Sequence, residues 1–164
     1  SASLVGSEMC IRDRLLLYMS YKGIYRPSNP KKYKGDQSNI IYRSLWERKF
    51  MNYCDLNENI LEWASEEFWI PYLDPTTNRV RRYFPDFFIK YKDKENNIRR
   101  SVIEVKPMRE TLEPKATKGK SRKTMINESV TYVKNQAKWK AAREFCADRK
   151  LEFKIMTEKE LGIR

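Results

Sequence analysis

The fold is most clearly encoded in the segment RRYFPDFFIKYKDKENNIRRSVIEVK, residues 81–106. Two apolar segments, around residues 84–89 and 102–105, flank the polar run KDKENN at residues 92–97. A polar run between two apolar segments is typical of a hairpin turn. With the turn centred near residue 95, residue 86 lies opposite residue 104 on the neighbouring strand.

Two carboxylates meet at this position, because residue 86 is Asp86 and residue 104 is Glu104. Directly opposed side chains have Cβ atoms about 5 Å apart, and like charges there are destabilising. A divalent cation between them would remove the repulsion, and Mg²⁺, with Mn²⁺ as a variant, is held by one or two carboxylates. The alternative is that Asp86 is a bulge or edge residue and that Glu104 belongs to a solvated face.

Lys106 lies two residues after Glu104 and therefore on the same face of the strand. Its ammonium group could position or help to deprotonate a water, or stabilise negative charge on a phosphate. Pro107 follows and ends the strand.

Working outward, the patterns predict a helix over residues 38–54, a strand over 62–72, a turn over 73–78 and a strand over 79–91. They predict a third strand over 98–106, a loop over 107–123, a long helix over 124–149, a strand over 151–157 and a last helical turn. The long helix has one apolar stripe, formed by Ile126, Val130, Val133, Ala137, Ala141 and Phe145. This α-β-β-β-α-β order predicts a mixed sheet flanked by helices, in the α/β or α+β class. Three tryptophans, Trp63, Trp69 and Trp139, are expected in the core rather than as stacking platforms.

Composition narrows the chemistry. The 164 residues include no histidine, which excludes a Ser-His-Asp triad, a Cys-His dyad and histidine metal sites. The net charge of +12 favours a polyanionic partner, most simply nucleic acid.

The three cysteines form no CxxC pair, which disfavours a zinc site, and free thiols in a reducing compartment fit best. No apolar run is long enough for a membrane span.

The N-terminal residues divide into two segments before the predicted domain at 38–164. Residues 1–18 contain GSEMCIRDR, which reads like translated adapter sequence, and we expect a non-native or disordered leader. Residues 19–37 are rich in Pro, Gly and basic residues and are expected to form an extended basic arm.

Two basic segments are candidate DNA contacts, because lysine and arginine bind phosphates without reading sequence. Their alternative role is that of solvated charge. The residues are Lys31, Lys32 and Lys34 in the arm, and Lys115, Lys118, Lys120, Arg122 and Lys123 in the loop after Lys106.

The motifs YFPD, residues 83–86, and IEVK, residues 103–106, resemble the P-D…(D/E)-x-K pattern of the PD-(D/E)XK nuclease superfamily. The predicted element order is also that superfamily's restriction-endonuclease-like core. The segment SLWERKF, residues 44–50, is similar to the first helix of the TnsA-like transposase endonucleases. The resemblance implies that Asp86, Glu104 and the Val105 carbonyl bind metal and that Lys106 is catalytic.

The same resemblance implies that Glu47 in the first helix completes the pocket. Glu47 has a competing interpretation, because Ser44-x-x-Glu47 is also a capping-box pattern. Gln136 on the long helix is a candidate accessory residue, and its alternative is an ordinary helix-surface position.

The segments YRSLWERKF, residues 42–50, and RRYFPDFFIKY, residues 81–91, are similar to a phage branch of these nucleases that acts in head completion. That resemblance implies a Mg²⁺-dependent endo- or exonuclease that processes packaged DNA for head–tail joining. The implied partners are DNA and phage head or neck proteins, in the host cytoplasm or the virion, with no membrane and no small-molecule cofactor. Three alternatives remain: a transposase or repair endonuclease subunit, a head-completion protein without activity, and a plain DNA-binding protein.

Overall fold

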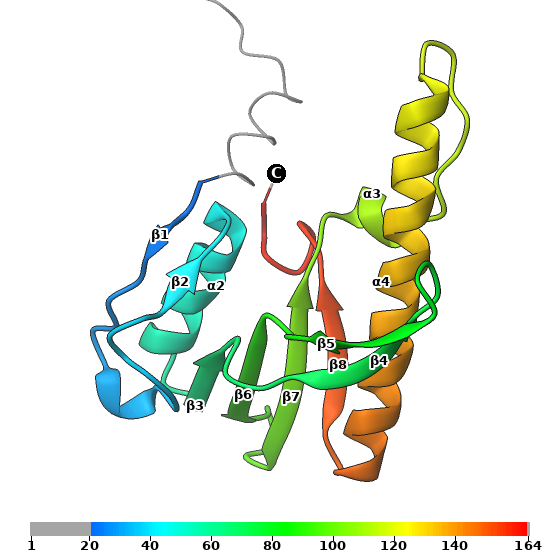
Figure 1. Cartoon of the computed structure of the whole chain (residues 1–164). Coiled ribbons are helices and arrows are strands. Elements are labelled where there is room, and N and C mark those ends of the chain that lie inside the picture. The colour runs from blue at the N-terminus through cyan, green and yellow to red at the C-terminus, as the bar shows by residue number, and fades with distance from the viewer. Residues whose placement is uncertain (1–20, 164) are drawn as a thin grey trace, which may run out of the picture.

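The computed structural model describes residues 21–163, and the expected leader at 1–18 lies outside these residues. A four-stranded sheet forms the centre, with strand order β3-β6-β7-β8 (Figure 1). The first three strands are antiparallel neighbours, whereas β7 and β8 run parallel. The sheet is therefore mixed, as predicted. The strands are β3 (Ile60–Ser65), β6 (Phe87–Lys92), β7 (Ile98–Val105) and β8 (Glu152–Met156).

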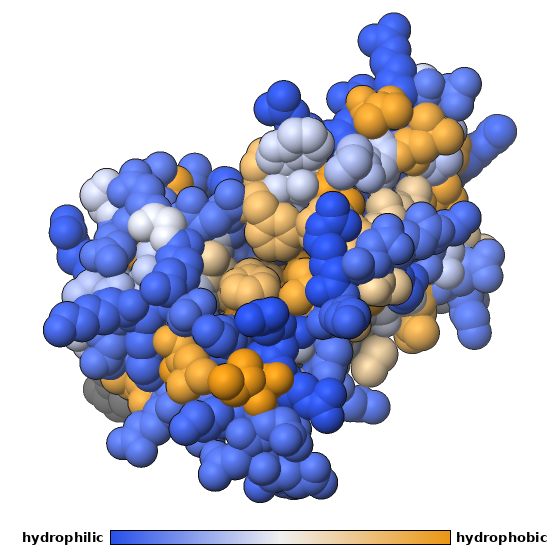
Figure 2. Space-filling view, turned by 90° about the horizontal axis from the view of Figure 1, so that it is seen from below, coloured by the Kyte–Doolittle hydropathy of each residue, from blue (hydrophilic) through white to orange (hydrophobic). Residues whose placement is uncertain are grey.

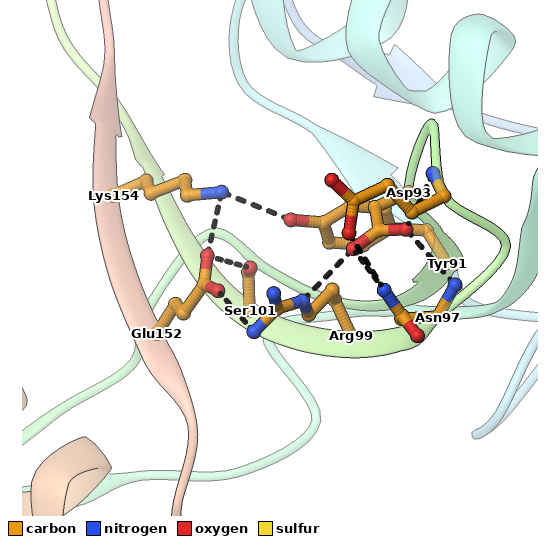
Figure 3. Close-up of polar contacts among 8 residues, drawn as sticks. Tyr91, Asp93, Asn97, Arg99, Ser101, Glu152 and Lys154 are labelled. Carbon is orange, nitrogen blue, oxygen red and sulfur yellow. Dashed lines mark hydrogen bonds and ion pairs between the residues drawn. The ribbon is translucent and has the colours of Figure 1, made fainter.

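The turn between β6 and β7 sets their register. The Asp93 carboxylate accepts hydrogen bonds from the amides of Glu95 and Asn97, both at 2.9 Å, and from Arg99 at 3.1 Å. Figure 3 shows this turn beside β8, where Arg99 also approaches Glu152. The charges at this end of the sheet thus meet opposite charges, and the turn holds the pairing that the sequence predicts.

A second hairpin lies between β3 and β6, made of β4 (Ile70–Asp74) and β5 (Arg79–Tyr83). The single strands predicted at 62–72 and 79–91 were therefore wrong, because each is two strands with a break. At the first break, Glu66 adopts a positive φ of 53°, which a strand cannot continue. At the second, Pro85 has no amide hydrogen to donate to the ladder.

The first helix, α2 (Leu45–Leu56), begins later than predicted. Ser44 is its N-cap and accepts a hydrogen bond from the Glu47 amide at 3.1 Å. The residues before it pair as strands instead, β1 (Gly23–Ile24) with β2 (Ile41–Tyr42). The predicted start at residue 38 was wrong because the cap residue outweighs the apolar spacing upstream.

The long helix is confirmed as α4 (Arg122–Asp148), with Ser121 as its N-cap. Between β7 and α4 lie a short helix, α3 (Met108–Thr111), and a loop. Residues 158–162 form turns rather than the predicted helical turn. Within the described residues, no helix is both long enough and apolar enough to span a membrane.

Two apolar cores cover the two faces of the sheet. On one face, α2 packs Trp46, Phe50 and Met51 against strand residues such as Phe87 and Ile103. On the other face, the β4–β5 hairpin and α4 share the second core. Its buried members are Ile70, Tyr72, Tyr83, Trp139 and Ala142. The helices thus flank the sheet, and the hairpin adds a cover on the α4 side.

The apolar stripe predicted along α4 is only half right. Ala137, Ala141 and Phe145 pack against the second core. Ile126, Val130 and Val133 are exposed, because the N-terminal half of α4 projects beyond the sheet (Figure 1). The helix is longer than the sheet that it covers.

The predicted extended arm at residues 19–37 was also wrong for its described part. Tyr25 and Tyr33 are buried against Trp63 in the first core. The Asp55 carboxylate accepts hydrogen bonds from the amides of Ser28 at 2.7 Å and Asn29 at 3.0 Å. Tyr25 and Tyr33, which lie on either side of the two prolines, therefore fix this segment around the end of α2, including the 3₁₀ turn η1 (Pro30–Lys32).

Candidate active site

The β6–β7 register brings Asp86 and Glu104 to the same end of the sheet. Phe87 pairs with Ile103, so the next positions along the two strands are residues 86 and 104. This is the juxtaposition that the turn arithmetic predicts. Glu104 is 4% exposed within β7, whereas Asp86 is half-buried just before β6.

Asp86 is fixed by two backbone contacts. Its Oδ2 accepts a hydrogen bond from the Val105 amide at 2.7 Å, and its own carbonyl accepts one from the Glu66 amide at 3.2 Å. Burial raises the pKa of Asp86 well above its usual range, and the Glu104 carboxylate raises it further. A negative charge at Asp86 is therefore costly unless a cation lies nearby.

Glu104 contacts a hydroxyl and an ammonium group. Its Oε2 accepts a hydrogen bond from the Tyr83 hydroxyl at 2.6 Å, and its Oε1 lies 3.5 Å from Lys106 Nζ. Burial alone would lower the pKa of Lys106, but the carboxylates of Glu104 and Asp86 outweigh it and the pKa is raised. The ammonium therefore stays protonated and acts as a positive charge beside the carboxylates.

Glu47 forms the predicted capping box, and its role in completing the pocket stays a prediction. It completes the capping box, since its carboxylate accepts hydrogen bonds from the Arg43 amide at 2.7 Å and the Ser44 hydroxyl at 3.0 Å. Burial raises its pKa, and its charge also interacts with those of Lys106 and Asp86. A helix cap thus lies within electrostatic reach of the carboxylate pair.

Sequence reasoning missed Tyr83, whose ring is buried beneath the hairpin and whose hydroxyl holds Glu104. It also missed Glu66, which forms an ion pair with Arg43 at 2.9 Å and adjoins Asp86 through its amide. Tyr83 pairs with Ile70, so the two side chains lie on the same, core-facing side of the β4–β5 hairpin. A sequence prediction that placed this hairpin correctly would therefore have placed Tyr83 in the core.

On α4, which also carries the predicted accessory residue Gln136, Lys138 approaches the candidate site. Lys138 Nζ lies 5.7 Å from the centre of the Tyr83 ring, within cation–π range. Burial lowers its pKa, although the charges of Glu104 and Asp86 oppose that shift. The described contacts do not bring Gln136 into this group, and its accessory role stays a prediction.

The basic segments differ in how free their charges are. Lys32 Nζ donates hydrogen bonds to the carbonyls of Asp55 at 3.0 Å and Asn57 at 2.8 Å, so it caps the end of α2 instead of facing outward. Lys120 pairs with Glu128. The other predicted DNA contacts, which stay predictions, are exposed: Lys31, Lys34, Lys115, Lys118, Arg122 and Lys123. Figure 1 shows the loop before α4 rising to the free end of that helix, away from the sheet.

The donor set fits a hard cation that keeps waters or substrate oxygens. Among residues 21–163, no cluster of three or more acidic, cysteine or histidine side chains could form an all-protein metal site. Asp86 and Glu104 provide two carboxylates, and Mg²⁺ is commonly held by that number together with substrate phosphate. The raised pKa of Asp86 shows that its negative charge is unfavourable in this environment, and a bound cation would stabilise that charge.

The core elements α2, β3, β6, β7, α4 and β8 follow the order α-β-β-β-α-β, with an Asp, a Glu and a Lys at one end of the sheet. This arrangement is that of the restriction-endonuclease-like class.

Comparison with known proteins gives the family. The family model described as "TnsA-like endonuclease N terminal" matches residues 57–158. The head completion nuclease of Enterobacteria phage T4 is 37% identical to this chain over 143 residues, which cover 85% of this chain and 93% of that protein. The chain therefore belongs to the TnsA-like endonuclease family.

Proposed function

We propose that this protein is a Mg²⁺-dependent deoxyribonuclease that processes packaged DNA in phage head completion and head–tail joining. The observation that carries the chemistry is the convergence of Asp86, Glu104 and Lys106 at one end of the sheet. The role in head completion is supported by the similarity to the phage T4 protein of that name. Phage head or neck proteins would then be partners, in the host cytoplasm or on the virion.

In the proposed reaction, Asp86, Glu104 and the Val105 carbonyl would hold the cation, which when bound would supply Lewis-acid chemistry at the scissile phosphate. The Lys106 ammonium contacts a phosphate oxygen, where it stabilises the negative charge that develops in the transition state. The Tyr83 hydroxyl keeps the Glu104 carboxylate in one orientation.

The decisive experiment compares cleavage of linear and circular DNA by the wild type with that by Asp86→Ala and Lys106→Ala, with Mg²⁺ and with a chelator. We expect metal-dependent cleavage by the wild type and a loss of about 100-fold or more in each variant. Asp148→Asn is a matched control, because Asp148 is an exposed carboxylate at the far end of α4. Equal activity in the variants and the wild type would refute the site.

The same experiment separates the alternatives. A head-completion or DNA-binding protein without activity would bind DNA in a salt-sensitive way and show no metal-dependent cleavage. Cleavage of closed circles would identify endonuclease activity, whereas degradation of linear DNA alone would identify an exonuclease.

A further inference from the structure

The β4–β5 hairpin has one buried face and one exposed face. Alternate residues such as Ile70, Tyr72 and Tyr83 point into the core with α4. The residues that alternate with them point away from the core and are exposed, although several are apolar. The exposed residues are Trp69, Pro71, Leu73, Val80, Arg82 and Phe84. Trp69 is 46% exposed, so its predicted place in the core was wrong.

Three of these side chains gather at the base of the hairpin. Ile70 pairs with Tyr83, so Trp69 and Phe84 occupy the next opposed positions. Phe84 is 44% exposed, and the Arg82 guanidinium lies 4.9 Å from the centre of the Trp69 ring. We call Trp69, Arg82 and Phe84 the aromatic ledge.

The aromatic ledge adjoins the candidate active site along both chain segments. Phe84 precedes Asp86 by two residues, and Trp69 follows Glu66 by three. The Glu66 amide donates a hydrogen bond to the Asp86 carbonyl at 3.2 Å, which ties the two segments together. The two chain segments that carry the aromatic ledge therefore lead directly to Asp86 and to the residue hydrogen-bonded to it.

Two aromatic rings and a guanidinium plane are the surface that a nucleobase recognises. Bases stack on exposed aromatic side chains without sequence preference, and arginine adds cation–π attraction. Figure 2 shows that the underside of the molecule is mostly hydrophilic, with its apolar surface gathered in a few patches. Trp69 and Phe84 occupy opposed positions on the hairpin, so they expose two neighbouring aromatic side chains rather than one isolated residue.

We infer that the aromatic ledge stacks the bases of the DNA strand whose phosphate lies at Asp86 and Glu104. This inference rests on the proposed nuclease function and adds the surface that orients its substrate. A paired base has its faces covered by neighbours, so the ledge binds a strand in which at least one base is unstacked. The hairpin then both covers the core and guides the strand.

The test measures binding of a labelled oligothymidylate in metal-free buffer, where cleavage does not occur. We expect Trp69→Ala and Phe84→Ala to weaken binding by about 10-fold each, as loss of one stacked base predicts. Trp69→Phe keeps a ring and should stay within about 3-fold of the wild type. Leu73→Ala is the matched control, because Leu73 is exposed on the same face but lies toward the hairpin tip.

Two further measurements make the test specific for bases. Trp46, Trp63 and Trp139, the other three of the four tryptophans, are buried, so fluorescence quenched by the oligonucleotide reports Trp69. An abasic oligonucleotide of equal length keeps the phosphates and should bind about 10-fold more weakly than the oligothymidylate.

Equal binding of the two oligonucleotides, or wild-type affinity in both alanine variants, would overturn the inference and leave the hairpin face to a protein partner. Because no metal is present, these results do not depend on cleavage. Loss of the nuclease proposal would appear separately, as absence of Mg²⁺-dependent cleavage by a protein that still binds the strand.

Discussion

Asp74 and Asp86 are two aspartates in similar positions, each at the end of a strand, in opposite electrostatic surroundings. Asp74 is fully buried in the hairpin turn, where it accepts hydrogen bonds from the Thr76 amide and hydroxyl. Arg81 and Lys134 lie 3.1 and 3.6 Å from its other oxygen. The Thr76 hydroxyl, more than any other neighbour, lowers the pKa of Asp74 to about 2. Burial and the Glu104 carboxylate instead raise the pKa of Asp86.

The difference separates a carboxylate whose charge is stabilised within the fold from one whose charge is not. Asp74 has two Thr76 hydrogen bonds and two nearby cations that stabilise its charge, so it holds the turn together. Asp86 has a second carboxylate beside it and Lys106 as the nearby cation, so its charge is stabilised fully only when something else binds. Perturbed groups of this second kind cluster at functional sites.

The largest expected effect comes from Asp86→Asn. Asn can still accept the Val105 amide hydrogen bond, but the substitution removes one of the two carboxylates that face each other. Cleavage should fall by about 100-fold or more. In chelator, the melting temperature should rise by about 2–4 °C, the shift expected for about 1 kcal/mol in a domain of this size. Calorimetry measures the melting temperature, and a cleavage assay on the same preparation measures the activity. A lower melting temperature would contradict the proposed repulsion between Asp86 and Glu104.

The next effect is that of Tyr83→Phe, which removes only the hydroxyl that Glu104 accepts. We expect cleavage to fall by about 10-fold and the Mg²⁺ concentration for half-maximal activity to rise, because the carboxylate loses its orientation. Direct Mn²⁺ titration of the protein without DNA should show the same weakening. Tyr72→Phe is the matched control on the same hairpin, and an unchanged metal requirement in Tyr83→Phe would refute the positioning role.

Asp74→Asn should lower the melting temperature at pH 7 and leave cleavage at low temperature close to the wild-type rate. The folded-state pKa lies below the usual 3.8, so the stabilisation is present above that value and is lost as the pH falls toward 2. Thermal unfolding between pH 7 and pH 2 measures this, and the melting temperatures of the two proteins should draw together as the pH falls from about 4 toward 2. A constant difference across that range would mean that the Asp74 charge is not the cause.

The smallest expected effect contrasts two lysines. Lys118 is exposed on the loop, and Lys118→Ala should reduce the slope of log K against log salt for duplex DNA by about 0.9. Lys32 donates to the end of α2, so Lys32→Ala should lower stability and leave the slope unchanged. Salt titrations of DNA binding by both variants compare them, and a reduced slope in Lys32→Ala would place that ammonium on the DNA.

The sequence was sufficient to predict the core order and the 86–104 register, because both depend on local patterns. The turn around Asp93 is polar, and the flanking strands are strongly apolar. Counting residues outward from the turn was therefore enough to pair position 86 with position 104. The break at Glu66 could not be predicted, because it depends on one backbone angle. The inward position of Tyr83 depends on packing against Trp139 and Ala142, which lie far along the chain.

The parallel pairing of β7 with β8 affects how the chain folds while it is being synthesised. The Lys106 amide donates to the Met156 carbonyl at 2.9 Å, and the Met108 amide donates to Glu158 at 2.8 Å. A nascent chain therefore carries Asp86 and Glu104 long before the residues that support their strand leave the ribosome. Until then β7 is an unprotected edge, and the carboxylate pair has no completed support. This end of the sheet, with the candidate site, can therefore be completed only after β8 has emerged from the ribosome.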